Sequence, residues 1–87
     1  MEKKIIDFYG AGCGNCKMLE SILAQIGTEF PDIKIEKLDV AAETKLVEKY
    51  GVSSLPTLVF IKNGKMVDKM AGLKPKSLIV KKIAEIF

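Results

Sequence analysis

The chain has 87 residues, of which 48% are hydrophobic, and this is enough for one small globular domain spanning residues 1–87. The formal net charge is +3, and lysines scattered among 11 acidic residues supply every positive side chain. Without arginine this pattern gives no basis for nucleic-acid binding, and the absence of histidine excludes histidine-based catalysis and metal ligation.

The first half of the chain predicts a strand, a helix and a second strand. Residues 4–9 read K-I-I-D-F-Y, a short β-branched and aromatic stretch that ends at a glycine. From Gly14 to about Phe30 the apolar residues recur on one helical face, and a proline follows. Residues 33–38 then begin with alternating apolar and charged side chains, which indicates a strand.

The second half predicts a short helix, a hairpin and a last helix. The short helix covers about residues 42–50, and the continuous apolar run T-L-V-F-I at 57–61 predicts a buried strand. Asn63–Gly64 is a preferred hairpin turn, so we expect a returning strand at 65–71. Apolar residues at helical spacing then run from Pro75 to the C-terminus. The predicted order, β-α-β-α-β-β-α, indicates an α/β fold with parallel and antiparallel pairs.

Cys13 and Cys16, the only cysteines, suit three explanations: a redox couple, half of a metal site, or two buried hydrophobic residues. A zinc site needs more ligands than one chain offers, so we predict no metal unless two chains share a site. Three nearby glycines leave Cys13 uncovered at a strand-to-helix junction, where the helix N-terminus favours a thiolate. Cys16 follows one turn later. The placement favours a redox couple, in which Cys13 attacks a disulfide and Cys16 displaces the reduced product.

Two charged residues fall on faces that should be apolar. Asp7 interrupts the first strand, and Lys37 shares a strand face with two isoleucines. The two strands should be neighbours, so we expect Asp7 and Lys37 to pair. A carboxyl with a raised pKa beneath the cysteines could take the proton from Cys16. The other interpretation is a purely structural ion pair, or an aspartate at a frayed strand end.

Taken together, these motifs resemble those of thioredoxins over essentially the whole chain. In order, the resemblance is carried by I-D-F-Y-G-A-G-C-G-N-C-K-M-L, E-K-L-D-V, K-Y-G-V-S-S-L-P-T-L-V-F-I-K-N-G-K and the Gly72 segment. It implies a thioredoxin-like fold with a four-stranded mixed sheet and helices on both faces. The chain is expected to lack the strand and helix that usually open this fold, which would make the strand at 33–38 a sheet edge.

The resemblance also implies roles for individual residues. Cys13 matches the attacking thiol and Cys16 the resolving thiol of a redox-active disulfide. Asp7 matches the buried acid of the family, and Lys37 matches the lysine that accompanies it. Pro56 matches the cis-proline that lies beside the disulfide.

In the same family, main-chain groups around this proline bind an extended client peptide. The matching positions here are Gly12, Leu55, Pro56 and Gly72. Besides the opening strand and helix, two residues depart from the family pattern: Gly12 stands where the family has a tryptophan, and Asn15 stands where it has a proline. Gly12 opens the site and bears on the choice of partner, whereas Asn15 lies between the cysteines and bears on their redox potential.

The resemblance implies a protein-disulfide reductase that works by dithiol–disulfide exchange through Cys13-Gly14-Asn15-Cys16 without a bound cofactor. Its expected partners are thioredoxin reductase or another dithiol donor, and disulfide-containing client proteins. No apolar run is long enough to cross a membrane and the start does not read as a secretory signal, so we expect a cytoplasmic protein. A monomer is the default expectation. The alternatives are a glutaredoxin-like, glutathione-dependent oxidoreductase and, from another class, a dimeric module that binds a metal or an iron–sulfur cluster.

Overall fold

The computed structural model describes residues 1–87 as four strands and three helices in the predicted order. No predicted boundary is wrong by more than two residues. The largest difference is at the second helix, because the amides of Ala42 and Glu43 donate to the Asp39 carbonyl and form a turn before the helix begins. The elements are β1 (Lys3–Tyr9), α1 (Gly14–Glu29), β2 (Lys34–Asp39), α2 (Thr44–Lys49), β3 (Thr57–Lys62), β4 (Lys65–Ala71) and α3 (Lys76–Ile86).

The four strands form one mixed sheet in the order β2-β1-β3-β4. β1 runs parallel to β2 and antiparallel to β3, and β3 pairs antiparallel with β4 through the predicted Asn63–Gly64 turn. β2 therefore lies at one edge of the sheet, as expected, and β4 lies at the other.

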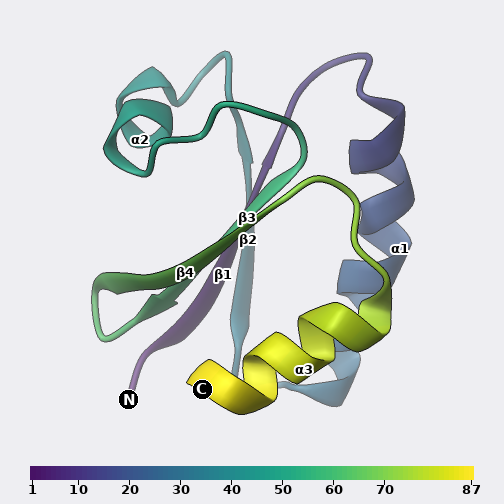
Figure 1. The fold of residues 1–87 in the computed structure, drawn as a ribbon, viewed down its shortest axis with the longest axis vertical. Helices are drawn as coiled ribbons and strands as arrows, with labels where there is room; N and C mark the ends of the chain where they lie inside the picture. Colours follow the sequence, from purple (N-terminus) through teal and green to yellow (C-terminus); the bar gives the residue numbers. More distant parts are fainter.

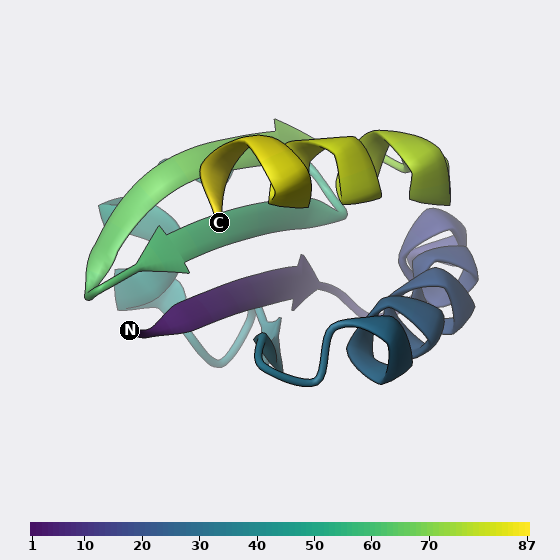
Figure 2. The same cartoon turned by 90° about the horizontal axis from the view of Figure 1, so that it is seen from below.

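Helices cover both faces of this sheet, which confirms the predicted layers. α1 and α3 lie on one face and α2 lies on the other (Figure 1). Figure 2 shows α3 extending across the sheet with α1 beside it. On the α2 side, Leu46 and Val47 cover a smaller buried cluster formed by β1 and β3. Under α1 and α3 lies the larger core: Ile5, Leu19, Leu23, Ile26, Ile33, Leu58, Phe60, Ile79 and Ile83.

The strand registers bring three loops to one end of the sheet. Phe8 pairs with Thr57, so the end of β1 lies beside the start of β3. Thr57 also pairs with Ala71, so the end of β4 lies on the other side of β3. Both chain termini lie at the opposite end (Figure 1). The residues that follow β1, precede β3 and follow β4 are therefore neighbours in space. No helix combines the length and the apolar composition that crossing a membrane requires.

Candidate active site

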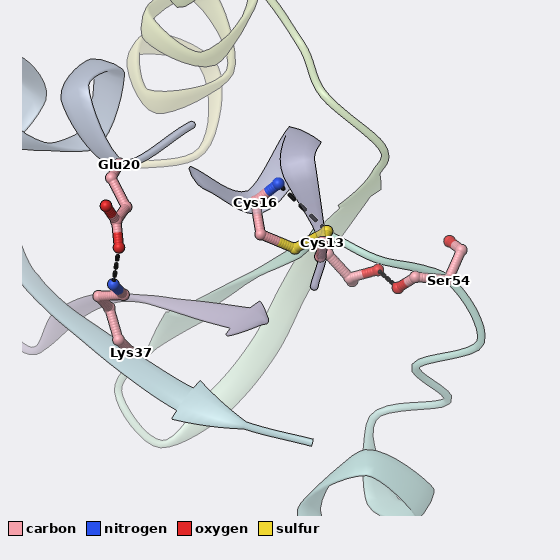
Figure 3. The surroundings of a disulfide bond; sticks show 6 residues. Cys13, Cys16, Glu20, Lys37 and Ser54 are labelled. Atoms are coloured by element: carbon pink, nitrogen blue, oxygen red, sulfur yellow. Dashed lines mark hydrogen bonds and ion pairs between the residues drawn. A yellow bond between two sulfur atoms is a disulfide. The ribbon is translucent and has the colours of Figure 1, made fainter. Parts of the chain in front are cut away.

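The two cysteines lie where β1 turns into α1. Cys13 is the N-cap of α1 and Cys16 lies in its first turn, so their Cα atoms are only 5.3 Å apart. In this structure the two sulfurs form a disulfide with an S–S distance of 2.21 Å (Figure 3). Cys13 is half-buried, whereas Cys16 is only 4% exposed. A partner molecule can therefore reach the Cys13 sulfur more readily than the Cys16 sulfur.

The start of α1 also provides a favourable electrostatic environment for sulfur. The Cys16 amide donates a hydrogen bond to the Cys13 Sγ at 3.2 Å. No acidic residue occupies the first turn of the helix, so nothing there offsets the positive end of the helix dipole. Donated N–H groups and a helix N-terminus stabilise negative charge on a cysteine sulfur. The site is therefore suited to thiolate chemistry at Cys13.

An open cavity of about 430 Å³ lies against the disulfide. Gly12 lies on its wall, exposed, with a φ of +75° that favours glycine and with no atom within 4 Å of the place where a Cβ would be. A glycine at this position leaves this part of the surface open. Side chains on the wall of the cavity include Tyr9, Cys13, Cys16, Lys17, Glu20 and Lys37.

Asp7 is fully buried in the middle of β1. Both of its carboxylate oxygens lack a hydrogen-bond partner. It shares its strand face with Ile5, which belongs to the core beneath α1 and α3. Burial raises the pKa of Asp7 from 3.8 to about 6; nearby Lys37 lowers this value and Glu20 raises it. A carboxyl with this pKa exchanges its proton close to neutral pH.

The predicted ion pair between Asp7 and Lys37 is not formed. The two residues are in register on β1 and β2, as expected for neighbouring strands. The Lys37 Nζ, however, lies 2.5 Å from the Glu20 Oε1 (Figure 3). The same Nζ lies 4.9 Å from the centre of the Tyr9 ring. The lysine side chain is 44% exposed, so its ammonium stays near the surface while the carboxyl of Asp7 lies deeper.

Glu20 is the site residue that the sequence analysis missed. It lies on α1 one turn after Cys16, and its side chain is half-exposed. Its pKa is lowered by the hydrogen bond from Lys37, whose own pKa is raised by the same bond. The four-residue spacing from Cys16 was the available signal, because residues four apart share a helix face.

The remaining predicted residues lie at the same end of the sheet. The Leu55–Pro56 peptide bond is cis, and Pro56 is buried at the start of β3. The Gly72 amide donates to the Pro56 carbonyl at 2.7 Å. A Cβ built on Gly10 would lie 2.7 Å from the Leu55 Cδ1, so the loop that leads to Cys13 contacts the loop before β3. The sheet thus brings together the segments that contain Gly12, Leu55, Pro56 and Gly72.

The structure contains no group of three or more histidine, cysteine, aspartate or glutamate side chains that could hold a metal ion. Cys13 and Cys16 are bonded to each other, and no other cysteine is present. The two cysteines are therefore arranged as a dithiol–disulfide couple.

Comparison with known proteins agrees with this geometry. The profile of the Thioredoxin family matches residues 1–85. The chain is 43% identical to a thioredoxin of Chlamydia muridarum over 81 residues, which cover 93% of this chain and 79% of that protein. It is 40% identical to a thioredoxin of Bacillus subtilis over 76 residues, covering 86% of this chain and 73% of that protein.

Solved structures point to the same family. The oxidised form of mitochondrial thioredoxin 3 from Saccharomyces cerevisiae superposes with a TM-score of 0.91 at 30% sequence identity, covering 98% of this chain and 79% of that one. The thioredoxin of Fasciola hepatica superposes with a TM-score of 0.89, also at 30% identity, covering 97% of this chain and 80% of that one. With a cysteine pair at the start of α1, this chain belongs to the thioredoxin family of protein-disulfide oxidoreductases, which work by dithiol–disulfide exchange.

Proposed function

We propose that residues 1–87 act as one domain that reduces disulfides in client proteins, with Cys13 as the attacking thiol and Cys16 as the resolving thiol. The observation that carries this assignment is the unequal exposure of the two sulfur-bearing residues. Cys13 is half-buried on the wall of an open cavity, whereas Cys16 is 4% exposed. An incoming disulfide reaches Cys13 first, and only an intramolecular attack can then use Cys16.

The exchange runs in two balanced steps. The Cys13 thiolate attacks one sulfur of the client disulfide, forming a mixed disulfide and releasing the other client sulfur as a thiolate. The Cys16 thiolate then attacks the Cys13 sulfur, which forms the Cys13–Cys16 bond and breaks the bond to the client. Two electrons pass from the cysteine pair to the client disulfide, and the two client sulfurs take up two protons.

Asp7 is the proposed acceptor of the Cys16 proton in the second step. Neither of its carboxylate oxygens has a hydrogen-bond partner. Burial raises its pKa to about 6, so that Asp7 is ionised at neutral pH but remains a usable base. Cys16 lies in the first turn of α1, the helix that covers this face of β1. Lys37 is proposed to influence the acid through its charge, since its proximity lowers the pKa of Asp7.

The client chain is proposed to bind along the end of the sheet. Gly12 borders the cavity beside the disulfide, and Leu55, Pro56 and Gly72 lie in the adjoining segments. Main-chain groups of an extended peptide can pair with such segments irrespective of side chains, which suits varied clients.

Proteins of the thioredoxin family are reduced by thioredoxin reductase and act on disulfide-containing proteins. We propose the same class of donor for this chain, or another dithiol donor, with no bound cofactor, because the cysteine pair itself stores the two electrons. We assign this exchange to the cytoplasm, where thiols are kept reduced. A monomer is proposed because exposed lysines on both sheet edges, Lys34 on β2 and Lys65 on β4, oppose pairing between copies.

Cysteine variants test the assignment, with insulin as the disulfide substrate and dithiothreitol as the donor. Cys16→Ser is expected to abolish turnover and to accumulate a mixed disulfide at Cys13, identified by non-reducing electrophoresis and mass spectrometry. Cys13→Ser is the matched control and is expected to lose turnover without accumulating adducts. If Cys13→Ser instead formed adducts through Cys16, the assigned roles would be reversed.

A further inference from the structure

Asp7 and Lys37 face each other across two strands, yet they do not form an ion pair. The Asp7 carboxylate is buried with no hydrogen-bond partner. The ammonium of Lys37, its partner in the strand register, is bound to Glu20 at 2.5 Å (Figure 3). A buried carboxylate without a partner is unfavourable, so a neighbouring lysine would ordinarily be drawn to it. Glu20 competes for that lysine.

The Glu20–Lys37 pair also lies between two cavities. The cavity of about 430 Å³ contains both cysteines on its wall. A second cavity of about 360 Å³ reaches Asp7 from the side of α1 and β2. Glu20 and Lys37 are the only residues that line both cavities. The ion pair therefore forms the boundary between the cysteines and the buried acid.

We propose that Glu20 is a positioning residue for disulfide exchange: its carboxylate holds the Lys37 ammonium at the boundary between the two cavities, away from Asp7, and so leaves the Asp7 carboxyl free to accept a proton. This inference rests on the proposed role of Asp7 as the base for Cys16. It adds the reason why a lysine in register with the acid does not neutralise it.

Few other charged groups face Asp7. On β3 its register partner is Leu58, which is apolar and buried. From α1, Glu20 lines the same cavity as Asp7, whereas Cys16 and Lys17 line only the neighbouring cysteine cavity. Beneath α3 the core residues are apolar. Of the three lysines of this helix, Lys76 and Lys82 are paired with other acids and Lys81 is exposed. On β2 the facing charge is Lys37. The position of Lys37 is therefore the main variable that sets the charge near Asp7.

The electrostatics agree with this geometry. Burial is the largest cause of the raised pKa of Asp7, Lys37 lowers that pKa, and Glu20 raises it. Removing the Glu20 charge would lower the pKa of Asp7 in two ways. It would remove a repulsive charge, and it would release the Lys37 ammonium to approach Asp7. Both changes favour the ionised carboxylate, so the pKa of Asp7 should fall.

The test is Glu20→Gln, which removes the charge and keeps the size of the side chain. Two midpoints are measured in the reduced protein. NMR titration of the Asp7 carboxyl carbon gives the first, the pKa of Asp7. Stopped-flow measurement of the second phase of reaction with an aromatic disulfide, over a range of pH, gives the second, the kinetic midpoint. A cation moving to within about 4–6 Å of a carboxyl lowers its pKa by about 1 unit or more, so both midpoints should fall by at least about 1 pH unit.

Glu29→Gln is the matched control, because Glu29 lies on the same helix and is also paired with a lysine, Lys76, but lines neither cavity. It should leave both midpoints unchanged. Glu20→Asp restores the charge and should return the midpoints toward those of the wild type. In a Lys37→Met background, Glu20→Gln should produce a much smaller shift, because the mobile cation is then absent.

The outcomes separate this inference from the role of Asp7. An unchanged NMR midpoint for Asp7 in Glu20→Gln would overturn the positioning role of Glu20. A shifted NMR midpoint with an unchanged kinetic profile would support Glu20 positioning Lys37 and would remove Asp7 as the base. Asp7→Asn tests the role of Asp7 independently. If Asp7 is the base, this variant must lose the kinetic midpoint near pH 6, and a retained midpoint would remove Asp7 as the base.

Discussion

The two halves of helix α1 differ in what they pack against. The N-terminal half starts at the cysteine pair, borders an open cavity and lies over a buried carboxyl without a partner. The C-terminal half contributes Leu23 and Ile26 to the core shared with α3. Each half also has a glutamate bound to a lysine: Glu20 to Lys37, and Glu29 to Lys76.

The same kind of ion pair has different consequences in these two surroundings. Glu29–Lys76 joins two helices at the surface, and a partly exposed pair of this kind contributes about 1 kcal/mol at most. Glu20–Lys37 is similarly exposed, but it lies above a buried acid whose charge it influences. The nearby buried group, rather than the ion pair itself, gives the second pair a functional consequence.

The largest effect on stability is expected in the C-terminal half. Ile26 is 0% exposed, and Ile26→Ala should lower the free energy of unfolding by about 4 kcal/mol, through lost burial and the cavity left behind. The Cys13–Cys16 reduction potential should not change, because no contact with the cysteines is removed. Denaturant unfolding and redox titration measure the two quantities.

Met18→Ala, at a side chain that is 61% exposed, is the control and should change stability by less than about 0.5 kcal/mol. A shifted potential in Ile26→Ala would mean that the two halves are coupled.

The next effect depends on pH and arises in the N-terminal half. The pKa of Asp7 is about 6 in the folded protein against an ordinary value of 3.8, so the folded state binds more protons than the unfolded chain between these values. The contribution of Asp7 to the free energy of unfolding is therefore fully present below about pH 4 and is lost as the pH rises through about 6. The full loss corresponds to about 3 kcal/mol.

Asp7→Asn should remove that loss. Its free energy of unfolding should exceed that of the wild type by up to about 3 kcal/mol at pH 7.5 and should match it at pH 4. Asp32→Asn is the control with the opposite sign, because the hydrogen bond from Lys3 lowers the pKa of Asp32. That variant should gain no stability at high pH. Equal pH dependence in Asp7→Asn and the wild type would contradict a buried, ionisable Asp7.

The smallest effect is expected where the cysteine loop contacts the loop before β3. Gly10→Ala places a Cβ 2.7 Å from the Leu55 Cδ1, so Leu55 must move, and we expect a loss of about 1 kcal/mol in unfolding free energy. The double variant Gly10→Ala/Leu55→Ala should recover part of this loss, which double-mutant analysis of denaturant unfolding will measure. Gly14→Ala is the control, because no atom lies within 4 Å of its new Cβ, and it should not destabilise the protein. Equal losses in both alanine variants would rule out the proposed clash.

Most of the fold could be predicted from local patterns in the sequence. The helical spacing of apolar residues and the Asn63–Gly64 turn placed every element within two residues of its observed bounds. The position of Cys13 and Cys16 after a strand and at a helix start likewise indicated a redox pair. These features depend on neighbours in the chain, so the sequence alone contains the information they need.

By contrast, the partner of Lys37 was decided only by the tertiary structure. The sequence correctly predicted that the strands of Asp7 and Lys37 are neighbours, but it could not show that Glu20 reaches the lysine from α1. In the sequence Glu20 is an ordinary acid on an exposed helix face. Its contact depends on how α1 lies over β1 and β2, and on the different depths of a surface ammonium and a buried carboxyl. By itself the sequence determined the elements and the cysteine chemistry, whereas only side-chain packing across elements decided the charge around Asp7.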